Sequence, residues 1–248
     1  KLYGPEICWA AQIACDEINQ AGGIQGRTLQ LIIEDDGSLP LSAVPAAETL
    51  VKKHHCTAII GNLLSNSRIA VANHIAEPLK IPMLNFSFYE GSISGPHFFS
   101  FAALPNQQID EMIPYMVKRF GPKVFFAGNN CEWPRGSIDS AKRLLLEHGG
   151  EIVGEGYFDI GCKDFHELLM LVKNSGADMF FPYAAGIDQI NLLNQFTAMG
   201  LKERMRVVMN HYNEAIAQQL RPEVREGCYS SNTYFMSLKN KFNKHYLE

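Results

Sequence analysis

The chain has 248 residues, of which 46% are hydrophobic and 19% charged, and its formal net charge is -4 at pH 7. This length and composition fit a globular protein with one large domain or two ordinary ones. A slightly acidic chain has no basic field to attract phosphate backbones, and its longest apolar stretches fall well short of the roughly 20 residues that cross a bilayer. Nucleic-acid binding and direct membrane insertion are therefore disfavoured.

An amphipathic helix is predicted at the start of the chain. Apolar residues recur at helical spacing behind Pro5, and Gly22 and Gly23 supply the stop. This spacing predicts a helix that faces the core, followed by a strand over residues 28–34. A glycine cluster after a helix and before a strand is the reverse of a phosphate-binding loop, so nucleotide binding is disfavoured.

Helices and strands alternate along the rest of the chain. The first set is a helix over 41–53, a strand over 57–60, a helix over 66–79 and a strand over 82–86. The second set is helix 107–120, strand 123–127, helix 135–148, strand 151–157, helix 164–174, strand 178–183, helix 187–199, strand 205–209, strand 228–235 and helix 238–247. This rhythm predicts an α/β fold with two doubly wound parallel-sheet lobes.

Six cysteines are spread along the chain: Cys8, Cys15, Cys56, Cys131, Cys162 and Cys228. None belongs to a C-x-x-C pair, which argues against structural zinc and a redox dithiol. Most are expected to be small buried hydrophobic residues. Unpaired cysteines favour a reducing compartment, whereas an even count also fits one or two disulfides, so both readings stay open.

Three segments carry a resemblance to a known family. The run Asp16-Glu-Ile-Asn-Gln-Ala-Gly-Gly-Ile-Gln-Gly-Arg27 resembles the first helix, turn and strand of type I periplasmic binding proteins, which include leucine/isoleucine/valine-binding, urea-binding and short-amide-binding proteins. Tyr89-Glu90-Gly91 resembles the short-amide and urea branch, and so does Trp133 before Pro134-Arg135. The resemblance implies two lobes joined by a hinge.

The same resemblance implies the domain boundaries. Lobe 1 is expected over residues 1–103 and lobe 2 over 104–232, with 233–248 as a crossing between lobes and the start of a further segment. The chain opens on Lys1 without a leader, and residues 2–5 look like the loop after a first strand. We therefore expect a piece of a longer protein that lacks the first strand and the C-terminal part.

The candidate ligand-binding residues lie in the loops after the strands, because ligands of open α/β sheets bind outside the carboxyl ends of the strands. In the first lobe these are Ser65, Ser87 and Tyr89, and in the second Trp133, Tyr183, Ala184, His211 and Tyr212. Ligand contact by Ser65, Ser87 and Trp133 is what the family resemblance implies. Five of these residues have a structural alternative. Ser65 could be an N-cap, Tyr89 could pack its own loop, Trp133 and Tyr183 could be core residues, and His211 could be a surface residue.

Enzymatic chemistry has little support in the sequence. The G-x-S-x-G, H-E-x-x-H and Ser-x-x-Lys signatures are absent. Asp35-Asp36-Gly37 is followed by apolar residues at the alternate positions of a calcium loop, which favours an ordinary turn over a metal site. We expect no cofactor, no metal and no catalysis, and an amide-processing enzyme is the disfavoured alternative.

The resemblance implies a binder that closes two lobes around a short amide, urea or an amino acid. Its partner would be an ABC-type permease and its location periplasmic or otherwise extracytoplasmic. The alternative is a sensor domain of a regulator or signalling receptor, which could also be cytoplasmic. The residues do not separate these two roles, because exchanges at a few loop positions can redirect specificity on one fold.

Overall fold

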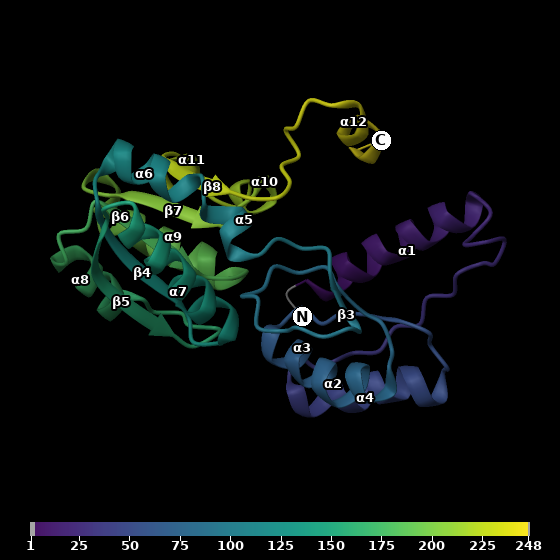
Figure 1. Cartoon of the computed structure of the whole chain (residues 1–248). Helices are drawn as coiled ribbons and strands as arrows, with labels where there is room; N and C mark the ends of the chain where they lie inside the picture. Colours follow the sequence, from purple (N-terminus) through teal and green to yellow (C-terminus); the bar gives the residue numbers. More distant parts are fainter. Residues whose placement is uncertain (1–2, 248) are drawn as a thin grey trace. The chain divides into compact units, whose positions relative to one another are not determined.

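The computed structural model describes residues 3–247, which form two compact units (Figure 1). The first unit comprises Lys1–Ser87 and Ile93–Phe101, and the second comprises Phe88–Ser92 and Ala102–Glu248. Each unit has a parallel β-sheet of its own. The predicted α/β class with parallel sheets is therefore confirmed.

The second unit contains five strands in the order β5-β4-β6-β7-β8, all paired in parallel. Their bounds are β4 Lys123–Asn129, β5 Glu151–Phe158, β6 Met179–Tyr183, β7 Arg206–Asn210 and β8 Cys228–Ser231. The strand order reverses beside β4, because β5 lies on one side of it and β6 on the other. Such a switch point leaves a crevice at the carboxyl ends of the strands.

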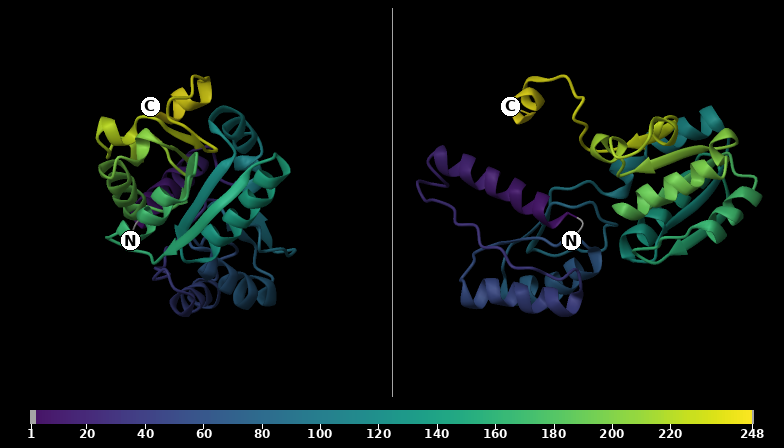
Figure 2. Two further views of the ribbon diagram at one scale, coloured as in Figure 1. Left: turned by 90° about the vertical axis from the view of Figure 1, so that its left-hand side faces the viewer. Right: turned by 180° about the vertical axis from the view of Figure 1, so that it is seen from behind.

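Helices cover both faces of this sheet, as the view from behind in Figure 2 also shows. Hydrophobic side chains alternate along each strand between two cores: Phe125 and Phe180 face one, Phe126 and Phe181 the other. The first core includes residues of α8 His166–Asn174 and α9 Ile187–Ala198, and the second residues of α6 Met112–Phe120 and α7 Glu132–Glu147. Both faces are buried because parallel strands carry apolar residues on both sides. The unit is completed by α5 Pro105–Ile109, η3 Leu201–Glu203, α10 Glu214–Ala217, α11 Pro222–Arg225 and α12 Lys241–Leu247.

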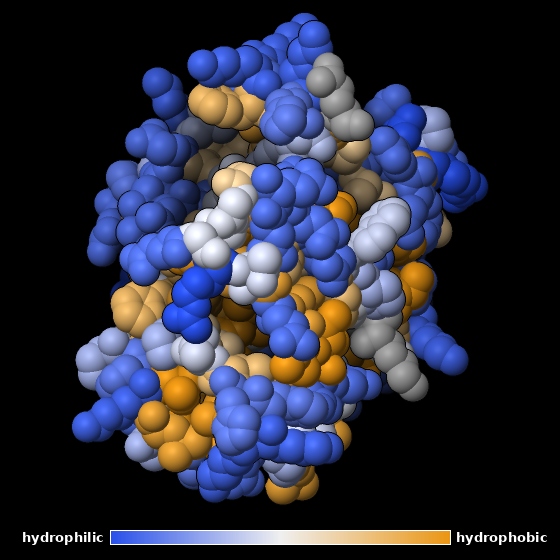
Figure 3. Space-filling model, turned by 90° about the vertical axis from the view of Figure 1, so that its right-hand side faces the viewer, coloured by the Kyte–Doolittle hydropathy of each residue, from blue (hydrophilic) through white to orange (hydrophobic). Residues whose placement is uncertain are grey.

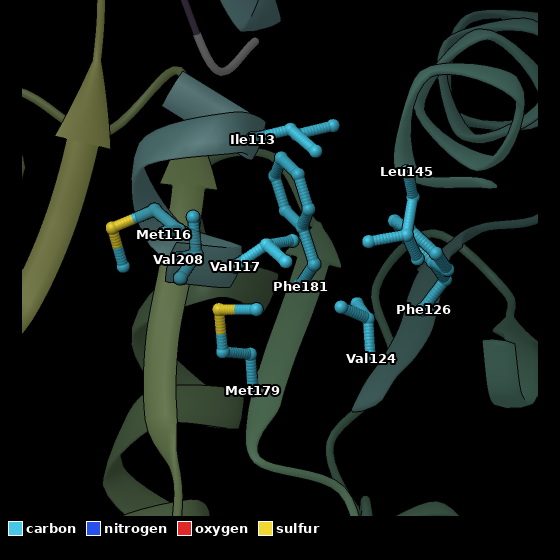
Figure 4. Close-up of a pocket in the computed structure, with 9 residues that line it drawn as sticks. All are labelled: Ile113, Met116, Val117, Val124, Phe126, Leu145, Met179, Phe181 and Val208. Carbon is cyan, nitrogen blue, oxygen red and sulfur yellow. The ribbon is translucent and has the colours of Figure 1, made fainter. Parts of the chain in front are cut away.

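A small void lies in the second of these cores, between the sheet and helices α6 and α7 (Figure 4). Its volume is about 10 Å³, and its lining is wholly apolar. A space of this size holds at most one water, and an apolar lining offers that water no partner. The void is therefore a gap in core packing and not a ligand site. Its lining residues are Ile113, Met116, Val117, Val124, Phe126, Leu145, Met179, Phe181 and Val208.

The first unit has a three-stranded parallel sheet in the order β1-β2-β3. Its strands are β1 Ile59–Ile60, β2 Met83–Asn85 and β3 Phe98–Ser100, of which β3 was not predicted. The predicted helices at 41–53 and 66–79 are present with wider π turns inside them. They consist of α2 Pro40–Glu48 with η1 Thr49–Lys53, and of α3 Ser65–Val71 with η2 Ala72–Ala76 and α4 Glu77–Leu79.

The first helix, α1 Gly4–Gln20, was predicted to face the core, and this prediction is wrong. Cys15 is its buried residue, whereas Trp9 is 74% exposed and Ile13 52%. A helix buries its apolar stripe only where a sheet or another helix lies against it. The orange groups at the surface in Figure 3 show that apolar side chains are exposed on one face of the molecule.

The predicted strand over residues 28–34 is also wrong, because the segment joins no sheet. The segment is held to α1 at Leu29. The Leu29 amide donates to Asn19 Oδ1 at 2.7 Å, and the Leu29 carbonyl accepts from Asn19 Nδ2 at 2.9 Å. The Asn19 side chain thus makes the two backbone hydrogen bonds with Leu29 that a neighbouring strand would make in a sheet. Alternating hydrophobicity predicts which side chains face a core, but it does not supply the strand that must pair with them.

The six cysteines are free thiols, and Cys15 alone among them is buried. The prediction that most of them are small buried residues is therefore wrong. The other five are half-buried, and two of them donate to backbone carbonyls: Cys162 to Asp164 and Cys228 to Val224. Within residues 3–247, none of the helices is both long enough and apolar enough to span a membrane.

Candidate functional site

The loops that follow β4, β5 and β6 are tied together by two buried side chains. Asn129, the last residue of β4, donates from Nδ2 to Asp188 Oδ2 at 2.8 Å and accepts at Oδ1 from the Ala185 amide at 3.0 Å. Asp188 Oδ2 also accepts from the Gly161 amide at 2.9 Å. Buried polar groups that satisfy one another in this way hold the backbone in one arrangement. The carboxyl edge of the second sheet is therefore a rigid platform.

Four rings gather at this edge, and we call them the aromatic cluster: Phe88, Trp133, Tyr183 and His211. The Trp133 ring centroid lies 5.8 Å from that of Tyr183 and 5.6 Å from that of His211. Phe88 lies 5.4 Å from His211, edge to face. Tyr183 ends β6, His211 follows β7, and Trp133 lies in the first turn of α7. The fold thus brings together three predicted site residues from a strand end, a loop and the start of a helix.

The indole of Trp133 carries a polar atom without a partner. Its Nε1 is buried and makes no hydrogen bond with any of residues 3–247. Buried polar groups in native proteins are nearly always paired, so such an exception needs an explanation. An indole nitrogen can only donate. A bound molecule with an acceptor oxygen would satisfy it.

His211 is neutral at physiological pH. Its backbone is in the left-handed region, with φ of 71°, and burial lowers the pKa of its imidazole to about 4. Burial in an apolar setting disfavours the charged form of a histidine, here among the rings of Phe88 and Trp133. Burial also raises the pKa of the Tyr183 phenol above its usual range. The aromatic cluster therefore carries no charge at pH 7.

The lowered pKa of His211 predicts that acid destabilises the second unit. The unfolded chain binds a proton near pH 6.5 and the folded one only near 4, so stability is complete above pH 6.5 and falls as the pH drops toward 4. A pKa difference of about 2.5 corresponds to at most about 3 kcal/mol. We expect His211→Asn to flatten the slope of unfolding free energy between pH about 7 and about 4.5, as measured by chemical denaturation. The same change at exposed His148 should leave the slope as in the parent, and equal slopes for both variants would contradict the prediction.

A second buried group at this edge was missed by the sequence analysis. Asn210, the last residue of β7, is 1% exposed, and its Nδ2 donates to Gln108 Oε1 of α5 at 2.9 Å. One feature of the sequence could have pointed to Asn210. Strands β2, β4 and β7 all end in an asparagine that is buried: Asn85, Asn129 and Asn210. An apolar run that ends in asparagine marks the carboxyl edge of a strand.

Three other predicted site residues are buried in the packing of the second unit. Ala184 and Tyr212 belong to the core that α8 and α9 cover. Burial raises the pKa of Tyr212 to about 12, and Tyr89 is likewise buried, at 6% exposure. Tyr183 is fully buried too, which fits its core alternative, and its role in ligand binding stays a prediction.

The remaining predicted residues surround a buried arginine in the first unit. Arg68 is fully buried, and its guanidinium donates to Asn85 Oδ1 at 2.6 Å, Ser65 Oγ at 2.8 Å and the Ser87 carbonyl at 3.4 Å. Ser65 is the first residue of α3 and Leu64 its N-cap, so the N-cap alternative for Ser65 is wrong. Asn85 also donates to the Ser87 carbonyl at 2.9 Å and to Ser100 Oγ at 3.0 Å. Arg68 thus organises both loops that were predicted to bind ligand.

Replacing Arg68 should destabilise the first unit strongly. Arg68→Ala removes the buried guanidinium and with it the hydrogen bonds to Asn85 Oδ1 and Ser65 Oγ, and a hydrogen bond from a charged group contributes about 1.5–3 kcal/mol. Arg68→Lys should recover only part of the lost stability, because a lysine ammonium cannot reproduce the planar set of donors of the guanidinium. Chemical denaturation measures the effect, and Arg27→Ala, at an exposed arginine of the same unit, is the control. Equal stability of the Arg68→Ala and Arg27→Ala variants would contradict the prediction.

The acidic turn is an ordinary one, as predicted. Asp35 Oδ1 accepts from the Gly37 amide at 2.9 Å, and Asp36 Oδ1 from the Ser38 amide at 2.8 Å. Asp36 Oδ2 accepts from Asn62 Nδ2 at 2.8 Å. These carboxylates therefore stabilise the turn. Across residues 3–247, no group of three or more His, Cys, Asp or Glu side chains is placed to hold a metal ion.

Comparisons with known proteins agree with this architecture. An amino acid binding protein of Pseudomonas aeruginosa is 27% identical over 208 residues, which are 82% of this chain and 55% of that protein. A solute binding protein of an ABC transporter from R. palustris, solved with benzoate, has a TM-score of 0.85 at 17% identity and covers 99% of this chain and 69% of its own. The branched-chain amino acid transporter substrate binding protein LivJ from Streptococcus pneumoniae, solved with isoleucine, has a TM-score of 0.76 at 24% identity, with 88% and 63% covered.

The chain spans about half the length of the curated relatives it matches. The likeness to solved structures lies below 25% identity and concerns the fold, which is that of type I periplasmic binding proteins, as the resemblance implied. A model of the family described as periplasmic binding protein matches residues 1–248, the full length of the chain. The chain therefore belongs to the periplasmic binding protein family.

Proposed function

We propose that this chain is the solute-binding part of an ABC-type import system and binds a small polar molecule without changing it chemically. The observation that carries the proposal is the aromatic cluster at the carboxyl edge of the second sheet, with the buried, unpartnered Nε1 of Trp133. Flat rings supply contact area, and the indole N–H supplies direction, which is the usual make-up of a small-molecule site.

The solved structures that resemble this chain suggest the class of solute. The two structures compared above hold isoleucine and benzoate, and both molecules carry a carboxylate. We therefore include amino acids and small aromatic acids with the short amides and urea that the sequence predicted. Closure of two lobes around the solute stays part of the proposal.

The test is a thermal-shift screen against four groups of solutes: amino acids, benzoates, short amides and urea. A molecule that binds only the folded protein at about 100 times its Kd adds about 2.7 kcal/mol, which raises Tm by several degrees. A shift confined to one group would identify the solute, and calorimetry would then give Kd. Mass spectrometry of the recovered solute checks for chemical change. A protein that none of these solutes shifts would overturn the proposal.

The proposed location is extracytoplasmic, and the proposed partner is a permease. A solute receptor of an importer delivers its ligand to a membrane protein outside the cytoplasm. Fractionation of cells that make the protein tests the location, since a cytoplasmic protein would instead favour the sensor role.

A further inference from the structure

Two arginines and three aromatic rings meet on the surface of the second unit, and we call them the arginine surface: Tyr115, Arg119, Phe120, Arg206 and Tyr229. The Arg119 guanidinium carbon lies 5.3 Å from the ring centroid of Phe120 and 6.0 Å from that of Tyr229. The Arg206 guanidinium carbon lies 5.8 Å from the Phe120 centroid, which is 4.9 Å from that of Tyr229. The Tyr115 ring lies 5.7 Å from Arg119. Both guanidiniums are therefore held against one aromatic platform.

Neither of these arginines has a carboxylate partner. Within residues 3–247, Arg119 and Arg206 make no ion pair, and both side chains are exposed. Of the five N–H donors of each guanidinium, Arg119 uses one for the Tyr115 hydroxyl at 2.6 Å, and Arg206 uses one for the Lys202 carbonyl at 3.2 Å. Stacking occupies the face of a guanidinium and leaves its edge to bind a carboxylate through two hydrogen bonds.

The composition of the arginine surface fits a protein partner. Tyrosine and arginine often carry the binding energy of protein interfaces, and aromatic rings supply apolar contact area. Tyr115 is 52% exposed, while Phe120 and Tyr229 are half-buried and so are fixed in place. Lipid and nucleic-acid surfaces are bound by larger clusters of lysines and arginines. Asp178 lies at the same edge of the sheet, where it accepts from the Lys123 amide at 2.9 Å, so this edge is not uniformly basic.

The arginine surface lies at the opposite end of the second sheet from the aromatic cluster. Arg206 is the first residue of β7, whereas His211 of the aromatic cluster directly follows the last. Tyr229 is the second residue of β8, which pairs with β7, and Phe120 ends α6 just before β4 begins. The 5 residues of β7 span about 16 Å. A partner can therefore cover the arginine surface and leave the aromatic cluster uncovered.

We propose that the arginine surface docks an acidic segment of a partner protein. Carboxylates of that segment pair with Arg119 and Arg206, and an apolar side chain of the segment packs on the rings. Charge complementarity determines this choice of partner. The chain as a whole is acidic, with a net charge of -4, so the rest of its surface repels an acidic segment that the two arginines attract. The contrast fixes where the partner binds. This docking is independent of the proposed function.

The first test compares two short labelled peptides, one of glutamate, leucine and serine residues and one with glutamine in place of glutamate. We expect the unaltered protein to bind the glutamate peptide at least about tenfold more tightly, measured by fluorescence anisotropy, with an affinity that falls as salt is added. Equal binding of the two peptides, or binding of neither, would overturn the proposal. Tighter binding of inorganic phosphate or of phosphatidylglycerol vesicles would also overturn it, because it would identify a phosphate site.

Charge reversal tests whether the peptide binds at this surface. Arg119→Glu and Arg206→Glu should each weaken peptide binding by at least about tenfold, and Tyr115→Ala by at least about threefold. The control is Arg143→Glu, which makes the same change of charge at an exposed arginine of α7 outside the arginine surface and should stay within about twofold of the parent. Equal weakening by the control would indicate attraction by net charge alone and overturn the proposal. The comparison of peptides needs no variant, so it tests the proposal even if a variant fails to fold.

A second copy of this chain is the other protein that could cover the arginine surface. Sedimentation of the unaltered protein and of the Arg119→Glu variant tests for it. We expect the two proteins to sediment alike. An oligomer that Arg119→Glu disrupts would overturn the acidic partner, because the surface would then be an interface between copies.

Discussion

Replacing Trp133 with alanine is expected to weaken solute binding by at least about tenfold, the largest binding effect of any single change in the second unit. The variant removes one wall of the aromatic cluster and the buried Nε1 donor. Trp133→Phe keeps an apolar ring and removes only the donor, so the difference between the two variants measures the hydrogen bond. Calorimetry with the solute found by screening gives both values of Kd.

Trp9 is the matched control for this prediction, because the chain contains 2 tryptophans and Trp9 is 74% exposed on α1. Trp9→Ala should bind as the parent does. The Trp9→Phe protein also leaves Trp133 as its one tryptophan, so a change in its fluorescence on binding would report on Trp133 directly. Equal binding by the Trp133→Ala and parent proteins would remove Trp133 from the site.

Replacing Phe180 with alanine is expected to lower the free energy of unfolding by about 3–5 kcal/mol. Phe180 is fully buried in the middle of β6. Its ring stacks on Phe196 of α9 with centroids 5.2 Å apart and also contacts Phe125 of β4 at 6.4 Å. The truncated side chain leaves a cavity between the sheet and α9 that these rings cannot fill. Urea denaturation followed by circular dichroism measures the loss.

The control for Phe180 is Phe242→Ala, at a phenylalanine that is 75% exposed on α12. Its effect should lie within about 0.5 kcal/mol, as for most surface positions. Similar losses at both positions would show that the core described for the second unit is not the cooperative unit that unfolds. Solute binding to the Phe180→Ala protein at low temperature should be retained, because Phe180 does not belong to the aromatic cluster.

The predictions for Trp133 and Phe180 distinguish residues that bind the solute from residues that stabilise the second unit. Phe180 and Tyr183 belong to the same strand, three residues apart. The first residue packs under α9, and the second ends the strand where the rings gather. Burial along the strand stabilises the sheet, and the residue at its carboxyl end is the one proposed to contact the solute, as expected for a doubly wound fold.

The second unit was predictable from sequence because its strands carry their own signal. Short apolar runs such as residues 178–183, set between helices of regular period, can be buried on both faces only in a parallel sheet covered on both sides. The rule that ligands bind at the carboxyl ends of strands pointed to Trp133, Tyr183 and His211, and the family resemblance favoured Trp133 among them. Whether these residues bind the solute stays a prediction.

In the first unit, hydrophobic periodicity did not predict how the elements pack. The helix at α1 and the segment over 28–34 have the right periodicity, yet the helix is largely exposed and the segment joins no sheet. Periodicity describes one surface of an element, and the partner for that surface comes from elsewhere in the molecule. Arg68 shows the opposite failure, because its side chain is fully buried although no residue pattern near it in the sequence predicts a buried arginine. Its burial depends on acceptors from α3 and from the loop after β2.

The sequence by itself determined the fold class, the order of elements in the second unit and the loops that hold the candidate site, because apolar period and turn residues are local properties. Only the tertiary structure decided which polar atoms are buried and how they pair. Asn210 and Gln108 are 102 residues apart, and the hydrogen bond between them exists because β7 and α5 meet in space. No local pattern in the sequence could have revealed that meeting.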